Sequence, residues 1–198
     1  MPNYVMNRLR VHPNNWQTIK NLLLDADGDV NFNNIIPMPD NVYRGDLLVG
    51  RGGAYDLPDG YTDNWYDWSW REWGTKWNAV FTRLDDELCE IAFESAWAHP
   101  RPVINELARR AVFPIHIAYA DEDFGRNLGA YVIHGDKRKL SWLPIDEFEL
   151  ENLACHIRYK ESIRQWRSDD EDYAGDDYPQ CAETYELWER LGLDQPAA

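Results

Sequence analysis

Side chains able to bind a metal ion or to act as a nucleophile are present but scattered along the chain. The histidines and cysteines are His12, His99, His116, His134 and His156, with Cys89, Cys155 and Cys181. No two histidines have the HxH or HxxxH spacing that directs two imidazoles at one zinc ion, and no two cysteines form a CxxC pair. The sequence therefore predicts neither a bound metal nor a cofactor.

A catalytic site would have to be assembled from residues far apart in the chain. The sequence has no GxSxG motif, no Walker loop and no dinucleotide-binding glycine motif. Asp121, Glu122 and His134 could be neighbours across adjacent strands, but a single histidine in a strand is more often a structural residue. We predict no catalytic residues, and a small-molecule-binding protein or an enzyme of unknown reaction is the alternative.

Five of the ten tryptophans lie between Trp65 and Trp77. Tyr66, Trp70, Trp73 and Trp77 are spaced by four, three and four residues, which places them on one face of a short helix that Gly74 would end. We expect this face to pack on the protein's own sheet. Trp65 and Trp68 lie off the stripe, and we expect them to stay exposed as partner contacts, since tryptophan is common in binding hot spots.

The chain is strongly acidic, with 35 Asp and Glu against 20 Lys and Arg and a formal net charge of −15. Nucleic-acid affinity depends on neutralising phosphates, so this charge predicts no direct nucleic-acid binding. The only opposing feature is a basic stripe, formed by Arg101, Arg109, Arg110, Lys137, Arg138 and Lys139.

An acidic surface of this kind can instead enter a basic groove on another protein. The candidate partner-binding acids are Asp85, Asp86 and Glu87, together with Asp169, Asp170, Glu171, Asp172, Asp176 and Asp177. The alternative is that the charge serves only to keep the protein soluble.

Hydrophobic periodicity predicts the elements that position these side chains. Residues 4–11 alternate as a strand, a helical stripe follows from Trp16, and residues 77–95 form a hairpin whose Glu90 and Glu94 face solvent. A helix from Pro102 and a strand from Ile115 complete the order βαββαβ. This order predicts an α+β protein with the ferredoxin-like fold, an antiparallel sheet with both helices on one face. Two more short strands flank a turn at Gly135.

The pattern predicts two regions. Residues 1–145 form the ferredoxin-like domain, interrupted by a tryptophan-rich helical insertion at 40–78, and residues 146–198 form a helical, acidic C-terminal extension. No apolar run approaches the ~18 residues that span a bilayer, and no secretory signal is visible. We therefore expect a cytoplasmic protein with reduced cysteines.

Several segments resemble the YubB-like family of phage and conjugative-plasmid proteins. They are "MPNYVMNRL", "FNNIIPMP", "NWYDWSWREWGTKWNA", "AWAHPRPVINELA" and "YADEDFGRNLG", all between Met1 and Pro144. The resemblance implies a ferredoxin-like domain, supplies no catalytic residues, and places the protein in a mobile genetic element inside a bacterial host. With the acidic charge, it suggests a protein-binding accessory protein that inhibits a host defence system, such as a CRISPR effector or a restriction enzyme.

Overall fold

A six-stranded antiparallel sheet lies at the centre of the computed structural model, which describes residues 3–50, 55–123, 127–142 and 157–158. The strands are β1 (Tyr4–Arg10), β6 (Val80–Asp85), β7 (Glu90–Ala96), β8 (Ile115–Asp121), β9 (Gly129–His134) and β10 (Lys137–Trp142). Their spatial order is β10-β9-β8-β1-β7-β6. Residues distant in sequence therefore pair at the centre, as Leu9 does with both Ile91 and Ile117.

The connectivity is that of the ferredoxin-like fold. The order β1, α1 (Trp16–Leu23), β6, β7, α3 (Arg101–Ala111), β8 gives the four neighbouring strands β8-β1-β7-β6. The hairpin β9–β10 extends the sheet beyond β8 and turns at Gly135, whose φ is +56°. The βαββαβ core and the two added strands expected from the sequence are confirmed.

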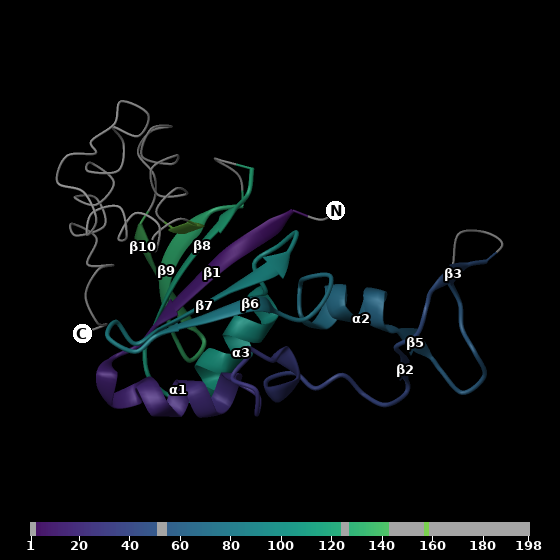
Figure 1. Ribbon diagram of the computed structural model, residues 1–198, viewed down its shortest axis with the longest axis horizontal. Coiled ribbons are helices and arrows are strands. Elements are labelled where there is room, and N and C mark those ends of the chain that lie inside the picture. Colours follow the sequence, from purple (N-terminus) through teal and green to yellow (C-terminus); the bar gives the residue numbers. More distant parts are fainter. Residues whose placement is uncertain (1–2, 51–54, 124–126, 143–156, 159–198) are drawn as a thin grey trace.

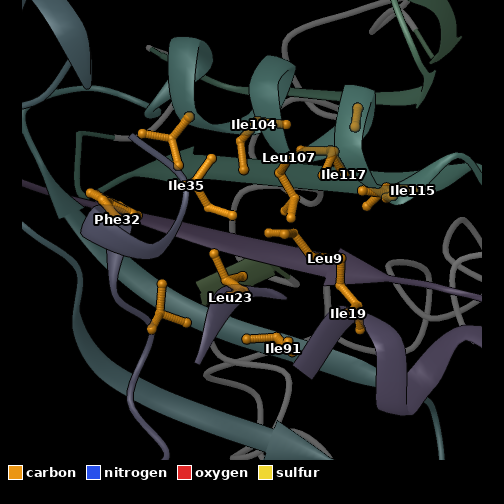
Figure 2. Packing of buried hydrophobic residues seen from close by; sticks show 14 of the residues in the cluster. Leu9, Ile19, Leu23, Phe32, Ile35, Ile91, Ile104, Leu107, Ile115 and Ile117 are labelled. Atoms are coloured by element: carbon orange, nitrogen blue, oxygen red, sulfur yellow. The ribbon is translucent and has the colours of Figure 1, made fainter. Parts of the chain in front are cut away.

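Both helices of this core pack on the same face of the sheet (Figure 1). The short 3-10 helix η1 (Pro13–Asn15) leads into α1, which buries Trp16, Ile19 and Leu23, and α3 buries a stripe that includes Ile104 and Leu107. These side chains meet Leu9, Ile91, Ile115 and Ile117 from the strands (Figure 2). Spacings of three and four in each helix, and of two in each strand, put all of these apolar groups on facing surfaces.

Glu90, on the other face of the sheet, is buried, so the expectation that it faces solvent is wrong. Glu90 is 2% exposed and accepts hydrogen bonds from Arg8 Nη1 at 2.7 Å and Arg10 Nε at 2.5 Å. Arg8 Nε in turn donates to the carbonyl oxygen of Ile157 at 2.6 Å. Alternation in a strand shows which residues share a face, but it does not show whether a distant segment covers that face.

The covering contact comes from Ile157 and Arg158. Ile157 is fully buried in a cluster with residues of four strands, namely Met6 and the alanines Ala92, Ala118, Ala120 and Ala130. Arg158 Nη1 donates to the Tyr4 carbonyl oxygen at 2.8 Å, and its Nη2 lies 3.9 Å from Glu94 and 3.6 Å from Glu122. Burial raises the pKa of Glu94. A segment beyond residue 145 thus lies on the sheet formed by the first 145 residues.

The segment between α1 and β6 carries the tryptophan-rich helix α2 (Trp65–Glu72). It also contains the 3-10 helix η2 (Phe32–Asn34), a parallel pair β2 (Val42–Tyr43) and β5 (Asp63–Asn64), and an antiparallel pair β3 (Leu48–Val49) and β4 (Tyr55–Asp56). Figure 1 shows α2 and these short strands extending past one end of the sheet.

None of the helices in the described ranges has the length and apolar character that a membrane crossing needs.

Candidate functional site: an aromatic cluster around Lys76

Helix α2 has a defined cap at each end. Asn64 Oδ1 accepts the backbone N–H of Asp67 at 2.9 Å, and Asn64 Nδ2 donates to the Asp67 carboxylate at 2.7 Å. At the other end, Gly74 takes a φ of +76° and its N–H donates to the Ser69 carbonyl oxygen at 3.0 Å. The expectation that Gly74 ends the helix is confirmed, and these caps fix the directions of the tryptophans.

One side of this segment is part of the main core. Trp68 is 5% exposed and Trp73 is 3% exposed, and their rings meet edge to face at 5.2 Å. Trp73 also contacts the ring of Phe32 at 5.7 Å, and its Nε1 donates to the Ile36 carbonyl oxygen at 2.9 Å. The expected exposure of Trp68 is therefore wrong.

The aromatic stripe of α2 that the sequence predicts to pack on the sheet is only in part buried. Trp73 is buried, but Tyr66, Trp70 and Trp77 are only partly buried. Trp65 is also partly buried, and its Nε1 donates to the Gly45 carbonyl oxygen at 3.2 Å. Because aromatic residues occur on several sides of α2, spacing alone does not identify the inward side.

The partly exposed rings surround one lysine. We call Tyr66, Trp70, Lys76, Trp77 and Trp97 the Lys76 cluster. Lys76 Nζ lies 4.6 Å from the ring centroid of Trp97, 4.7 Å from that of Trp77 and 5.9 Å from that of Tyr66. The Trp70 ring stacks on the Trp97 ring at 5.7 Å with an interplanar angle of 14°. At the three distances from Lys76 Nζ to the rings, a cation is attracted by the negative face of an aromatic ring.

Hydrogen bonds hold both chain segments that supply the cluster. Thr75 is fully buried, and its Oγ1 donates to the Ala96 carbonyl oxygen at 2.7 Å, which ties the segment before Lys76 to the end of β7. Trp97 follows directly with a left-handed φ of +65°. Its N–H donates to the Asn3 carbonyl oxygen at 2.8 Å, and its own carbonyl oxygen accepts from Asn127 Nδ2 at 3.1 Å.

This backbone conformation is costly for a bulky residue, and strained residues of this kind cluster at functional sites. Trp97 is 37% exposed, so the cluster is open to solvent at this residue. The sequence prediction missed the cluster because Trp97 comes from a different element and the helical stripe was assigned to the core. The available signal was Lys76 itself, a cation placed between Trp73 and Trp77.

The acidic turn between β6 and β7 is bound to the rest of the protein. Asp86 Oδ1 accepts from Trp16 Nε1 at 2.7 Å and from Lys20 Nζ at 3.2 Å, and these hydrogen bonds lower the pKa of Asp86. Asp85 Oδ1 accepts the Leu88 backbone N–H at 3.0 Å, and Glu87 is exposed. The expected acids from Asp169 to Asp177 lie outside the described residues.

Asp121, Glu122 and His134 do not meet. Asp121 lies opposite Val5 at the far end of β8, whereas His134 follows Ile133, which pairs with Ile115 at the start of that strand. Six residues along a strand correspond to about 20 Å. The Asp121 carboxylate instead accepts from Asn3 Nδ2, Asn127 Nδ2 and the Asp123 backbone N–H. The suggestion of a catalytic group at these residues is wrong.

His99 is the centre of a buried polar network. Its Nδ1 lies 2.7 Å from Asn7 Oδ1, its Nε2 lies 2.7 Å from the Tyr131 hydroxyl, and its ring stacks on Tyr119 at 4.3 Å. Burial, together with the nearby charge of Arg101 and Arg138, lowers the pKa of His99 to about 3. A neutral imidazole with both nitrogens in hydrogen bonds is a structural group.

Other reactive groups in the described part of the chain are also engaged or protected. Burial and the neighbouring Asp86 raise the pKa of the Cys89 thiol. Within the predicted basic stripe, Arg109 and Arg110 both donate to Glu106, which lowers the pKa of that carboxyl. The described part of the chain contains no group of three or more His, Cys, Asp or Glu side chains placed to hold a metal ion.

Comparison with known proteins identifies one domain. Residues 76–158 match the family model described as the ferredoxin-like domain in Api92-like protein. No curated protein and no solved structure matches the chain. The matched range begins at Lys76, includes β6 to β10, and ends at Arg158 on the covered face of the sheet. The chain therefore contains a ferredoxin-like domain similar to that of Api92-like proteins.

Proposed function

We propose that this protein is a non-catalytic accessory protein of a phage or plasmid that binds a protein of its bacterial host. The observation that carries the proposal is the Lys76 cluster, in which Trp97 stays 37% exposed in a left-handed backbone conformation. Partly exposed tryptophans held in place by their neighbours contribute large contact areas at low entropic cost and are enriched in binding hot spots. The net charge of −15 favours a basic partner.

In its more specific form, the proposal is that the partner is a nucleic-acid-binding defence complex, a CRISPR effector or a restriction enzyme, whose basic groove the protein occupies. The net charge supports this form. The turn at Asp85 and Asp86 supports it less, because both carboxylates accept hydrogen bonds from their own chain. The Lys76 cluster is therefore the better candidate contact among the described residues.

A pull-down from bacterial lysate tests the proposal. The tagged full-length protein is incubated at low and at moderate salt, and the bound proteins are identified by mass spectrometry. Trp97→Ala is the test variant, and Tyr61→Ala is its control, because Tyr61 is 40% exposed on the insertion and lies outside the cluster. We expect a nuclease or CRISPR subunit that is lost as salt rises and is captured poorly by Trp97→Ala only. If no host protein is captured at either salt, the proposal is wrong; a captured host protein that binds no nucleic acid contradicts its more specific form.

A further inference from the structure

The Lys76 cluster has the composition of a cation-binding cage. The Lys76 ammonium has two indole faces within 5 Å and a phenol ring at 5.9 Å. Aromatic cages of this kind bind ammonium groups through the ring quadrupoles. In this protein the cage is occupied by a lysine of the same chain.

The rings are held in place independently of the lysine. Trp70 stacks behind Trp97, and the Trp97 backbone is fixed by Asn3 and Asn127. The Thr75 hydrogen bond to Ala96 anchors the segment that leads to Trp77. Lys76 is different, because among the described residues its side chain contacts the three ring faces alone, and it is partly exposed. A flexible side chain held by ring contacts alone can leave while the rings stay.

We infer that the Lys76 cluster is a binding site for a lysine side chain of the partner protein, which displaces Lys76 from the rings. This inference rests on the proposed function and names the chemistry of its contact. The overall charge of −15 attracts a basic surface to the protein, and the three rings then take one ammonium group from it. Lys76 occupies the ring faces until the partner arrives, so it competes with the partner's lysine.

Tetramethylammonium chloride is the probe, titrated against sodium chloride at equal concentration. The full-length protein carries ¹⁵N-labelled tryptophan, and the indole N–H resonances of Trp77 and Trp97 report occupancy. The test variant Lys76→Ala removes the ammonium group from the three ring faces. Its matched control is Lys20→Ala, which removes an equal charge from another lysine–tryptophan contact, where Lys20 Nζ lies 4.7 Å from the Trp16 ring centroid.

We expect Lys76→Ala to bind tetramethylammonium roughly 2- to 30-fold more tightly than the wild type, the range that one cation–π contact supplies. Lys20→Ala should match the wild type. Trp97→Ala added to Lys76→Ala should abolish binding, and Trp97→Phe should give an intermediate affinity, which separates loss of the ring from loss of folding. The unperturbed resonance of the buried Trp73 indole serves as the folding check. Equal dissociation constants for Lys76→Ala and wild type would overturn the inference.

The same variants in the pull-down separate the two proposals. The cage predicts that Lys76→Ala retains more partner than Lys20→Ala, and that Trp97→Ala retains less. A partner captured equally by all three variants overturns the cage and leaves the proposed function standing. Tetramethylammonium binding by Lys76→Ala without any captured partner supports the cage and contradicts the proposed function.

Discussion

The five residues of the segment 73–77 have four different structural roles. Trp73 is buried and bonds to the Ile36 carbonyl oxygen, Gly74 takes the positive φ that ends α2, and Thr75 bonds to the Ala96 carbonyl oxygen. Lys76 and Trp77 then lie in the half-exposed cluster. A tryptophan-rich string therefore contains a core contact, a helix stop, a buried anchor and a surface group within five positions.

Burial of His99 makes stability depend on pH. Its folded-state pKa of about 3 lies below the ordinary value of 6.5, so between these values the unfolded chain binds a proton that the folded chain excludes. The free energy of unfolding should therefore decrease as the pH is lowered below 6.5, by about 2.5 kcal/mol from this group between pH 7 and pH 4.5. Urea unfolding followed by circular dichroism at several pH values measures this.

The control for this prediction is His99→Gln, which removes the titrating group. His116, whose pKa is also lowered by burial, and the acids Asp86 and Glu106 contribute to both proteins alike. We expect the variant to be less stable at pH 7 but to show a smaller loss on acidification. If the two proteins lose the same free energy between pH 7 and pH 4.5, His99 is not the origin of the dependence.

The end of helix α2 depends on a glycine in close contact with another helix. Gly74 has a φ of +76°, and a Cβ placed there would lie 2.7 Å from Pro102 Cδ in the first turn of α3. Gly60 has a φ of +93° but nothing within 4 Å of such a Cβ. Substituting Gly60 and Gly74 therefore separates the free-energy cost of a positive φ from the cost of a clash with Pro102.

We expect Gly60→Ala to lower the free energy of unfolding by about 1 kcal/mol, because an L-residue is strained at positive φ. Gly74→Ala should cost about 2 to 3 kcal/mol, since the methyl group also forces α2 and α3 apart. Chemical denaturation of both variants measures the difference. Equal costs would mean that the approach of Pro102 relaxes without penalty.

The sequence predicts an element of this fold correctly where its residue pattern is compatible with a single structure. The strand at residues 4–10, the stripe of α1 and the turn at Gly135 lie where period, capping and glycine placement put them. The side of α2 that faces inward did not follow, because Trp65, Tyr66, Trp68 and Trp70 give the helix aromatic groups on several sides. Contacts with Phe32 and Ile36, from a distant loop, decided it.

At the scale of the whole molecule, the described sheet carries buried side chains on both faces. The helical face is packed with Leu and Ile, whereas the opposite face has alanines around Met6 and the buried Arg8–Glu90–Arg10 group under Ile157. Small side chains allow close approach, and the guanidinium of Arg8 satisfies the Ile157 carbonyl oxygen. Ile157 therefore belongs to the folded core of the sheet.

Replacing Ile157 tests that conclusion in the full-length protein. We expect Ile157→Ala to lower the free energy of unfolding by about 2 to 5 kcal/mol, because it leaves a cavity over the alanine surface. Val49→Ala, at a residue that is 69% exposed, is the control and should change it by less than about 0.5 kcal/mol. Thermal and urea unfolding provide the measurement, and an unchanged midpoint for Ile157→Ala would contradict a structural role for this contact.

By itself, the sequence determined the βαββαβ order, the positions of the helices and hairpins, and the acidic charge, because these depend on residue type and on spacing within one segment. Only the tertiary structure decided that Trp68 is buried and Trp97 partly exposed, that Glu90 is buried beneath Ile157, and that Asp121 and His134 lie at opposite ends of their strands. Those features depend on contacts between residues distant in the chain, and local periodicity carries no information about which distant surface will cover a given face.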